Sequence, residues 1–331
     1  MTIAALAAES LHGQPAPLFE LRSSAGFTAR ISAAGGRLVT LAYPDGTDVV
    51  VGPEKLDDFT GPDLYAGALC GRVANRISHA AFMLDGTRHH LLVNRGDLQL
   101  HGGPDGFHNR VWACDVRGDS LLLTLASPAG DQGYPGTLHV TATYALTGST
   151  LSCVMEATTD APTIVNLTNH VYWNLAGGGP VGEHTLQMEA DRYCVAEAAL
   201  VTGELRDCAG SAFDFRSARK LNEAFAAVPE GIDHNFCLTG ERGRLRLAGV
   251  LEHPASGRRM ELSTSECGLQ IYTANHFGEG SHGKNAKLPG RHHAIAMEPQ
   301  AWPDAPNRAG FPSIVLRPGE VYTHGMEWKF S

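Results

Sequence analysis

Residues 138–146 read Leu138-His139-Val140-Thr141-Ala142-Thr143-Tyr144-Ala145-Leu146 and place an apolar side chain at every second position. This alternation predicts a β-strand that buries one face, because successive side chains on a strand point to opposite sides. The end of the chain repeats the pattern, with more polar neighbours between Tyr322, His324, Met326, Trp328 and Phe330. Both stretches indicate strands of a half-buried sheet.

Glycine and proline divide the rest of the chain into short segments. The 38 Gly and 18 Pro residues produce the spacing that is typical of an all-β protein. We expect one hairpin from strands at 38–43 and 48–51 around Pro44-Asp45-Gly46. A second should join 81–84 to 89–93, since Asp85-Gly86 favours a tight turn with positive φ. The best helix candidate is 217–228, which ends before Pro229 and Gly231.

The chain shows no change of composition, linker or internal repeat that would divide it. We therefore expect a single domain over residues 1–331. Residues 1–14 form an Ala-rich stretch in which no acid, base or ligand-binding residue is placed by a motif, so we interpret them as a peripheral N-terminal extension that takes no part in any catalysis.

Composition excludes several classes of protein. The 331 residues contain no apolar run long enough to span a membrane. The net charge of −9 lacks the basic surface that nucleic acids and anionic membranes require, so a neutral small molecule is the expected partner. The seven cysteines are odd in number and form no C-x-x-C pair, which indicates reduced thiols in a cytoplasmic protein. The first residues lack a basic leader, which argues against a secretory signal.

Cofactor motifs are weak or absent in the sequence. Residues 177–182 match G-x-G-x-x-G, but Pro180 and the lack of a following amphipathic helix favour a loop. The pairs His89-His90 and His292-His293 are adjacent in sequence, and neighbours on a strand point to opposite faces, so neither pair suits one metal ion. The sequence therefore predicts neither a metal nor a cofactor.

Five polar clusters stand out among the apolar strands. They supply amide, guanidinium, imidazole and carboxylate groups, a mixture that suits a ligand with many hydroxyl groups. The clusters are 71–77, 100–103, 164–170, 231–236 and 292–300.

These clusters resemble, in order from about Gly67 to Phe330, the motifs of the galactose mutarotase (aldose 1-epimerase) family. The stretches that carry the likeness are Gly71-Arg72 with Ala74-Asn75-Arg76-Ile77, Leu100-His101-Gly102-Gly103, Asp131-Gln132-Gly133-Tyr134-Pro135-Gly136, Asn166-Leu167-Thr168-Asn169-His170-Val171-Tyr172-Trp173-Asn174-Leu175, Gly231-Ile232-Asp233-His234-Asn235-Phe236, Gly268-Leu269-Gln270-Ile271-Tyr272-Thr273-Ala274-Asn275, and Glu298-Pro299-Gln300.

The resemblance implies a large antiparallel β-sandwich with an open sugar cleft. It also implies roles for seven residues. Glu298 would be the general base and His170 the general acid. Arg76, His101 and Asp233 would hold the sugar, with Asn75 and Gln270 as further contacts. Two departures from the family pattern are Val73, where an aromatic residue is common, and the loop from Asn275 to Gly290, which bears on substrate preference.

The implied reaction can be examined as chemistry. Conversion of one anomer of an aldose into the other needs one base for the C1 hydroxyl and one acid for the ring oxygen, and we expect an ionised Glu and a protonated His. No hydride moves, so no redox cofactor is required. The expected function is thus a mutarotase acting on free hexoses such as glucose and galactose.

Two alternatives remain open at this stage. A hexose-phosphate 1-epimerase would need a basic cluster beside the cleft, and the candidates are Arg72, Arg76, Arg110 and Arg291. A sugar-binding module without catalysis would keep Arg76 and Asp233 but lose the acid or the base. Each site residue also has a structural interpretation: His170 as a buried imidazole bonded to a carbonyl, and Glu298 as a strand residue in solvent. The sequence leaves the oligomeric state open.

Overall fold

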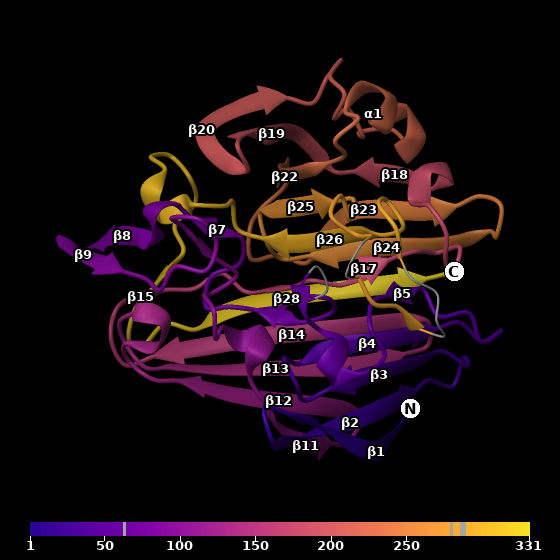
Figure 1. Ribbon diagram of the computed structural model, residues 1–331, viewed down its shortest axis with the longest axis horizontal. Coiled ribbons are helices and arrows are strands. Elements are labelled where there is room, and N and C mark those ends of the chain that lie inside the picture. Colours follow the sequence, from indigo (N-terminus) through magenta and orange to yellow (C-terminus); the bar gives the residue numbers. More distant parts are fainter. Residues whose placement is uncertain (62–63, 279–280, 285–288) are drawn as a thin grey trace.

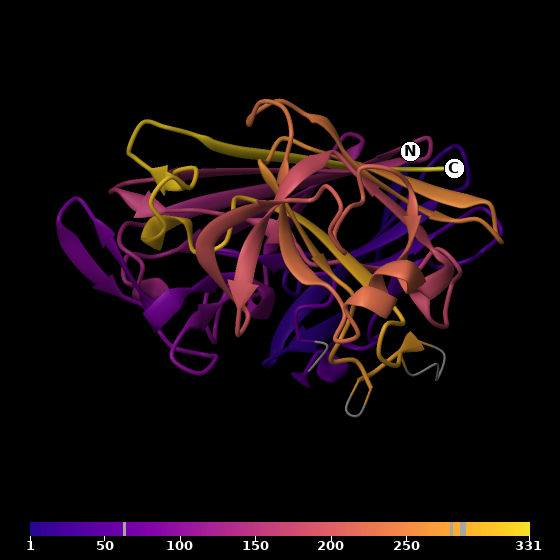
Figure 2. The ribbon, with the colours of Figure 1, turned by 90° about the horizontal axis from the view of Figure 1, so that it is seen from above.

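A computed structural model describes residues 1–61, 64–278, 281–284 and 289–331. Its strands pair antiparallel in a nine-stranded, a seven-stranded and a four-stranded sheet, and the remaining strands form two-stranded pairs. Figure 1 shows β12, β13, β14 and β28 running side by side across the molecule, with α1 at the top and the hairpin of β8 and β9 projecting at the left. Figure 2, seen from above, places both termini at the opposite end from that hairpin.

The nine-stranded sheet contains, in spatial order, β11 (Ala113–Arg117), β12 (Ser120–Ser127), β13 (Leu138–Thr147), β14 (Thr150–Thr159), β28 (Tyr322–Phe330), β24 (Arg258–Thr264), β23 (Arg246–His253), β18 (Thr185–Met188) and β21 (Arg219–Lys220). The seven-stranded sheet contains β20 (Leu200–Asp207), β19 (Ala190–Glu197), β22 (Asp233–Leu238), β25 (Gly268–Tyr272), β26 (Ile295–Gln300), β17 (Tyr172–Trp173) and β5 (Val50–Val51).

The four-stranded sheet contains β1 (Thr2–Leu11), β2 (Gln14–Arg22), β3 (Thr28–Ser32) and β4 (Arg37–Ala42). The two-stranded pairs are β7 (Arg76–Ile77) with β10 (Gln99–Leu100), β6 (Leu69–Cys70) with β16 (Thr168–Asn169), β8 (Ala81–Leu84) with β9 (Thr87–His90), and β15 (Thr163–Ile164) with β27 (Val315–Leu316). Helical segments are α1 (Leu221–Ala227) and the 3-10 turns η1 (Leu56–Asp58), η3 (Ser78–Ala80), η4 (Phe107–Asn109), η5 (Asp131–Gly133), η6 (Val181–Glu183) and η8 (Ala305–Asn307).

The all-β sandwich expected from the sequence is confirmed. The alternating apolar residues of β13 are all buried, and they pack in one continuous core with apolar residues of the other two large sheets. Within the described ranges, no helix combines the length and the apolar character that crossing a bilayer requires.

The turns expected from the sequence are confirmed in part. Asp85 and Gly86 have φ values of 48° and 80° and form the two-residue turn between β8 and β9, although β9 begins at Thr87 rather than at His89. The prediction that 38–43 and 48–51 form a two-stranded hairpin is wrong. Ala42 bridges Asp48, but β4 then joins the four-stranded sheet and β5 the seven-stranded sheet. This turn therefore connects two sheets.

The helix expected over 217–228 is shorter in the structure. Arg219 and Lys220 form β21 and pair with β18, so their main chain belongs to the edge of a sheet and the helix begins only at Leu221. Residues 1–14 contribute β1, which pairs with β2 at the edge of the four-stranded sheet. That this stretch takes no part in catalysis stays a prediction.

The seven-stranded sheet has two different faces, and this difference positions the polar residues. Ile295 and Met297 of β26 point into the core, as do Leu269 and Ile271 of β25. Because alternate residues of a strand face opposite ways, Glu298 and Gln270 lie on the other face of the sheet. Asp233 of β22, Gln270 of β25 and Glu298 of β26 therefore lie on one surface.

Candidate active site

His170 and Glu298 lie against each other. His170 directly follows β16, and Glu298 is in β26. The Nε2 atom of His170 is 3.5 Å from Oε1 of Glu298, and the two side chains are only 6% and 2% exposed. The alternative interpretation of Glu298 as a strand residue that points into solvent is thereby excluded.

Gln270 is in β25, which pairs with β26, and Asp233 is in β22, which pairs with the other side of β25. Gln270 is the cross-strand partner of Glu298, and its Nε2 donates a hydrogen bond of 2.6 Å to Oδ1 of Asp233. The other carboxylate oxygen of Asp233 lies 3.5 Å from Nη2 of Arg76. A carboxylate, an amide and a guanidinium thus occur in one row beside the base.

Arg76 is the first residue of β7, Asn75 directly precedes that strand, and His101 directly follows its partner β10. Arg76 is the partner of Leu100 in that pair, which brings His101 beside Asn75. The main-chain N–H of Asn75 donates to Nδ1 of His101, and Oδ1 of Asn75 accepts from Nη1 of Arg76. His101 has a φ of 47° and is followed by Gly102 and Gly103, and its ring centroid lies 5.1 Å from that of His170.

The structure therefore brings all seven residues singled out from the sequence together. Their contacts form a closed ring that runs from His170 to Glu298, Gln270, Asp233, Arg76, Asn75, His101 and back to His170.

Burial changes the proton affinities of the central groups. Burial, with a contribution from the charge of Asp233, raises the pKa of Glu298 well above its usual value. Burial lowers the pKa of His170 to about 4, and it lowers the pKa of His101 well below its usual value. Burial thus shifts both Glu298 and His170 toward their neutral forms, whereas the sequence led us to expect an ionised pair.

Several buried polar atoms of the site make no hydrogen bond within the described part of the protein. They are Nδ1 of His170, Oε2 of Glu298 and Oε1 of Gln270. An unpaired polar atom in the interior is costly, so such a group of atoms indicates a surface that is completed by a polar ligand.

Three residues of the site are close enough to one another that they could hold a metal ion. His101, His170 and Glu298 each offer a ligand atom, and these atoms lie within 4.8 Å of one another. A histidine that binds a metal normally donates its second ring N–H to an acceptor. Nδ1 of His101 instead accepts a hydrogen bond from the main-chain N–H of Asn75, so the second nitrogen of this ring faces a donor. The arrangement around His101 fits a metal ion poorly.

One residue in the site escaped the sequence analysis. Tyr65 lies among three imidazoles, with ring centroids 4.7 Å from His101, 4.6 Å from His108 and 6.1 Å from His170. The buried guanidinium of Arg37 donates to the carbonyl oxygens of Leu64 and Ala66, on either side of Tyr65. No periodic or motif signal marks Tyr65, because its place depends on contacts between distant segments.

Comparisons with known proteins agree with this geometry. The model of the aldose 1-epimerase family matches residues 17–329. The chain is 40% identical to galactose mutarotase from Homo sapiens over 86% of its own length and 84% of that protein. It is 34% identical to aldose 1-epimerase from Escherichia coli over 96% of each chain.

Solved structures show the same fold. An aldose epimerase homologue from C. elegans has a TM-score of 0.87 and 30% sequence identity, with 94% of this chain and 98% of that chain covered. Galactose 1-epimerase from Lactobacillus acidophilus also has a TM-score of 0.87, with 28% identity and coverage of 100% and 98%. The match to the family model over nearly the whole chain and the identity to these relatives show that the protein belongs to the aldose 1-epimerase family.

Proposed function

We propose that this protein interconverts the α and β anomers of free hexoses such as glucose and galactose, with Glu298 as general base and His170 as general acid. The observation that carries the proposal is the contact between these two groups inside a ring of polar side chains, in a member of the aldose 1-epimerase family.

The reaction proceeds through the open-chain sugar. Glu298 takes the proton of the C1 hydroxyl while His170 protonates the ring oxygen, and the bond between C1 and that oxygen breaks to give an aldehyde. Rotation about the C1–C2 bond presents the other face of the aldehyde. The former ring oxygen, now a hydroxyl, then attacks C1 and returns its proton to His170. Glu298 gives its proton to the aldehyde oxygen, which becomes the new C1 hydroxyl. Both groups end as they began, so no external acid or base is consumed.

One shared proton is enough for this cycle. The pair has two forms, one with a neutral carboxylic acid and a neutral imidazole, the other with a carboxylate and an imidazolium. Both forms contain the same number of protons, and Nε2 of His170 is 3.5 Å from Oε1 of Glu298. The neutral pair matches the open-chain stage, in which Glu298 holds the proton. The ionised pair matches the cyclic sugar, whose hydroxyl groups can donate hydrogen bonds to the carboxylate and stabilise its charge.

The other five residues hold the sugar in this proposal. Asp233 accepts hydrogen bonds from hydroxyl groups, Arg76 and His101 donate to hydroxyl oxygens, and the amides of Asn75 and Gln270 can do both. Arg76 and Asp233 already contact each other, so their orientation is set before the sugar binds.

The hexose-phosphate alternative receives less support. The guanidinium of Arg72 is buried and donates to Ser127, Thr163 and the carbonyl oxygens of 128, 135 and 136. Arg110 pairs with Asp105 and Asp131, and Arg291 donates to Pro229. Of the four candidate arginines, Arg76 belongs to the ring of site residues. A non-catalytic binding module is disfavoured because Glu298 and His170 are both in place.

We also propose that residues 1–331 act as a single domain and that the protein is cytoplasmic. The continuous core supports the first proposal, and the seven free cysteines, six of them buried, support the second.

Polarimetry tests the proposed function directly. Freshly dissolved α-glucose and α-galactose should reach their equilibrium rotation faster when protein is added, and the final rotation should not change, because a catalyst does not alter the equilibrium. Glucose 6-phosphate serves as the comparison substrate. Acceleration with the phosphorylated sugar alone would support the alternative, and no acceleration with any free aldose would refute the proposal.

Removal of metal ions should leave the activity unchanged. All proton transfers are assigned to side chains, and the hydrogen bond from Asn75 to His101 disfavours a bound ion. The measurement is the initial polarimetric rate before and after dialysis against a strong chelator. A loss of rate that added metal restores would contradict this prediction.

Replacing Asp233 with Asn should chiefly weaken sugar binding. The variant keeps the shape of the side chain but loses its charge, and with it the pairing to Arg76 and the strongest acceptor for hydroxyl groups. We expect KM to rise by about 10- to 100-fold, as for the loss of one charge-assisted hydrogen bond, while kcat changes less. The control is Asp97→Asn, which removes an exposed carboxylate paired with His79. A variant in which kcat falls and KM stays constant would move Asp233 from binding to catalysis.

A further inference from the structure

The contact between His170 and Glu298 depends on a register that main-chain pairing does not maintain by itself. Tyr172 of β17 pairs with Ala296 of β26 in an antiparallel ladder. If the same register is followed two residues back from Tyr172 and two residues forward from Ala296, His170 lies opposite Glu298. However, the ladder between these strands covers only Tyr172 and Trp173. Something else must keep residues 166–170 beside residues 298–301.

The main chain of residues 166–170 is directed to a different neighbour. The N–H of His170 donates to the carbonyl oxygen of Ala68, and the N–H of Gly67 donates to that of His170. Asn166 exchanges main-chain hydrogen bonds with Arg72 and Ala74 in the same way. Consequently Asn166 and His170 direct their main-chain groups to residues 67–74, and β16 pairs with β6 rather than with β26. The strand that carries the acid could therefore slip against the strand that carries the base.

Two side chains replace the missing ladder. The side-chain amide of Asn166 accepts a hydrogen bond of 2.8 Å from the N–H of Ala301 and donates one of 3.3 Å to its carbonyl oxygen. The hydroxyl of Thr168 donates a hydrogen bond of 2.7 Å to the carbonyl oxygen of Pro299. The amide of Asn166 therefore pairs with Ala301, the residue directly after β26, as a strand residue would, since it supplies both a donor and an acceptor.

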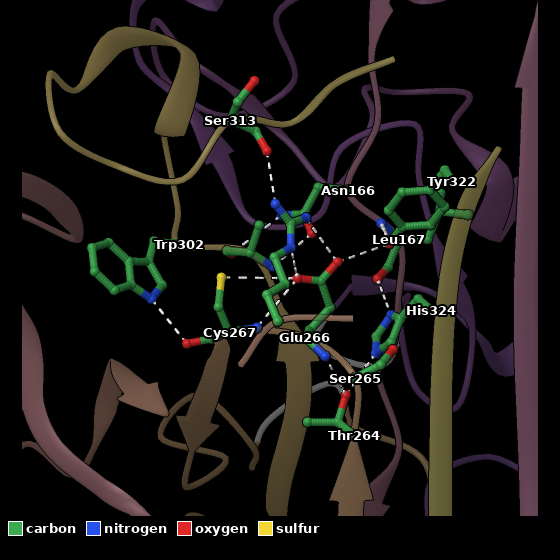
Figure 3. Close-up of polar contacts among 12 residues, drawn as sticks. Asn166, Leu167, Thr264, Ser265, Glu266, Cys267, Trp302, Ser313, Tyr322 and His324 are labelled. Atoms are coloured by element: carbon green, nitrogen blue, oxygen red, sulfur yellow. Dashed lines mark hydrogen bonds and ion pairs between the residues drawn. The ribbon is translucent and has the colours of Figure 1, made fainter. Parts of the chain in front are cut away.

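The opposite side of the same segment is held independently, as Figure 3 shows. The hydroxyl of Tyr322 accepts from the N–H of Leu167 and donates to Glu266, and Nδ1 of His324 bonds the carbonyl oxygen of Leu167. Glu266 is fixed in turn by two hydrogen bonds from Arg242, of 2.8 Å and 3.0 Å. Removal of the Asn166 amide would thus leave the segment anchored and free only the side that faces β26.

We propose that Asn166, assisted by Thr168, is a positioning residue that sets the distance between His170 and Glu298. Asn166 is 1% exposed, and both the oxygen and the nitrogen of its side-chain amide bond Ala301, so it acts through the two strands and does not contact the sugar. This inference rests on the proposed function, because it takes His170 and Glu298 as the acid and the base.

The test compares two asparagines whose side chains are similarly buried. Asn166→Ala removes both hydrogen bonds to Ala301. The matched control is Asn174→Ala, which also removes a fully buried amide with three hydrogen bonds, to Ala176, Gly179 and His293, away from the acid and base. Both variants should lose thermal stability. Only Asn166→Ala should also lower kcat, by about 10- to 100-fold as expected for a misplacement of about 1 Å, with little change in KM.

Thr168 provides a second test in case Asn166→Ala does not fold. Thr168→Val keeps the shape and removes the hydroxyl, and Thr168→Ser restores the hydroxyl. We expect a lower kcat in the Val variant and recovery in the Ser variant. Wild-type kcat in Thr168→Val, or equal kcat losses in Asn166→Ala and Asn174→Ala, would overturn the positioning role.

A double variant separates this inference from the proposed function. When Glu298→Gln has already removed the base, the loss caused by Asn166→Ala should largely disappear, because both changes act on one step. Losses that simply multiply would refute the positioning role alone. Wild-type kcat in Glu298→Gln itself would refute the assignment of the base, and the positioning role with it.

Discussion

Replacing Glu298 with Gln should lower kcat by about 10²- to 10⁴-fold, the usual contribution of a positioned general base, while KM changes less. The amide has the shape of the carboxylic acid and can still bond hydroxyl groups, but it cannot take the proton of the C1 hydroxyl. Because the side chain of Glu298 is only 2% exposed and lies against His170, an outside base has poor access. The measurement is the polarimetric rate over a range of sugar concentrations.

The same substitution at Glu261 serves as the control. Glu261 lies in β24 on the other large sheet and pairs with Arg259 and Lys329, so Glu261→Gln should leave kcat close to that of the wild type. Near-wild-type turnover in Glu298→Gln would remove this residue as the base, and Asp233, which lies beyond Gln270 in the same row, would be the next candidate.

Replacing His170 with Asn should have an effect of similar size, about 10²- to 10⁴-fold on kcat, because the ring oxygen would leave without a proton donor. His184→Asn is a closely matched control. His184 is also a fully buried histidine whose pKa is lowered by burial to about 4, but its ring bonds Leu175 and Val181 outside the site. Both variants should lose stability, and only His170→Asn should lose turnover. Wild-type turnover in that variant would shift the acid role to another residue, with His101 as the first candidate.

The pH dependence of kcat/KM should report on the same pair. The active pair carries one proton, so the rate should fall at low pH when a second proton binds and at high pH when the last proton leaves. Since the pKa of His170 is lowered to about 4 and that of Glu298 is raised, the acid limb should lie near pH 4. The two apparent values belong to the pair rather than to single residues. Either substitution should abolish the bell shape.

Much of the fold could be predicted from local pattern. The alternation in 138–146 and at the end of the chain identifies β13 and β28, since a strand with one buried face imposes a period of two on its sequence. The Asp85-Gly86 turn was identified because few dipeptides tolerate two consecutive positive φ values. The predictions of where the helix begins and of a hairpin from β4 and β5 were wrong for one reason. In both cases the main chain pairs with a strand that is distant in the sequence.

The candidate site was identified from residue types and motif order, whereas the support of the site was not. Asn166 and Thr168 belong to the motif that pointed to His170, and nothing in their spacing distinguishes a sugar contact from a hydrogen bond to β26. Their partners Ala301 and Pro299 become neighbours only when the sheets assemble. Tyr65 escaped notice for the same reason.

The sequence by itself determined the all-β class and which chemical groups are available, because strand periodicity and side-chain chemistry are local properties. Tertiary structure decided how each group is used. Arg72 and Arg76 stand four positions apart in one motif, yet Arg72 is enclosed by carbonyl oxygens in the interior and Arg76 faces Asp233 in the site. Tertiary structure also shifted the pKa values of Glu298 and His170. The pKa of a carboxyl or imidazole group depends on its burial and on neighbouring charges, and these are supplied here by strands that lie far apart in the chain.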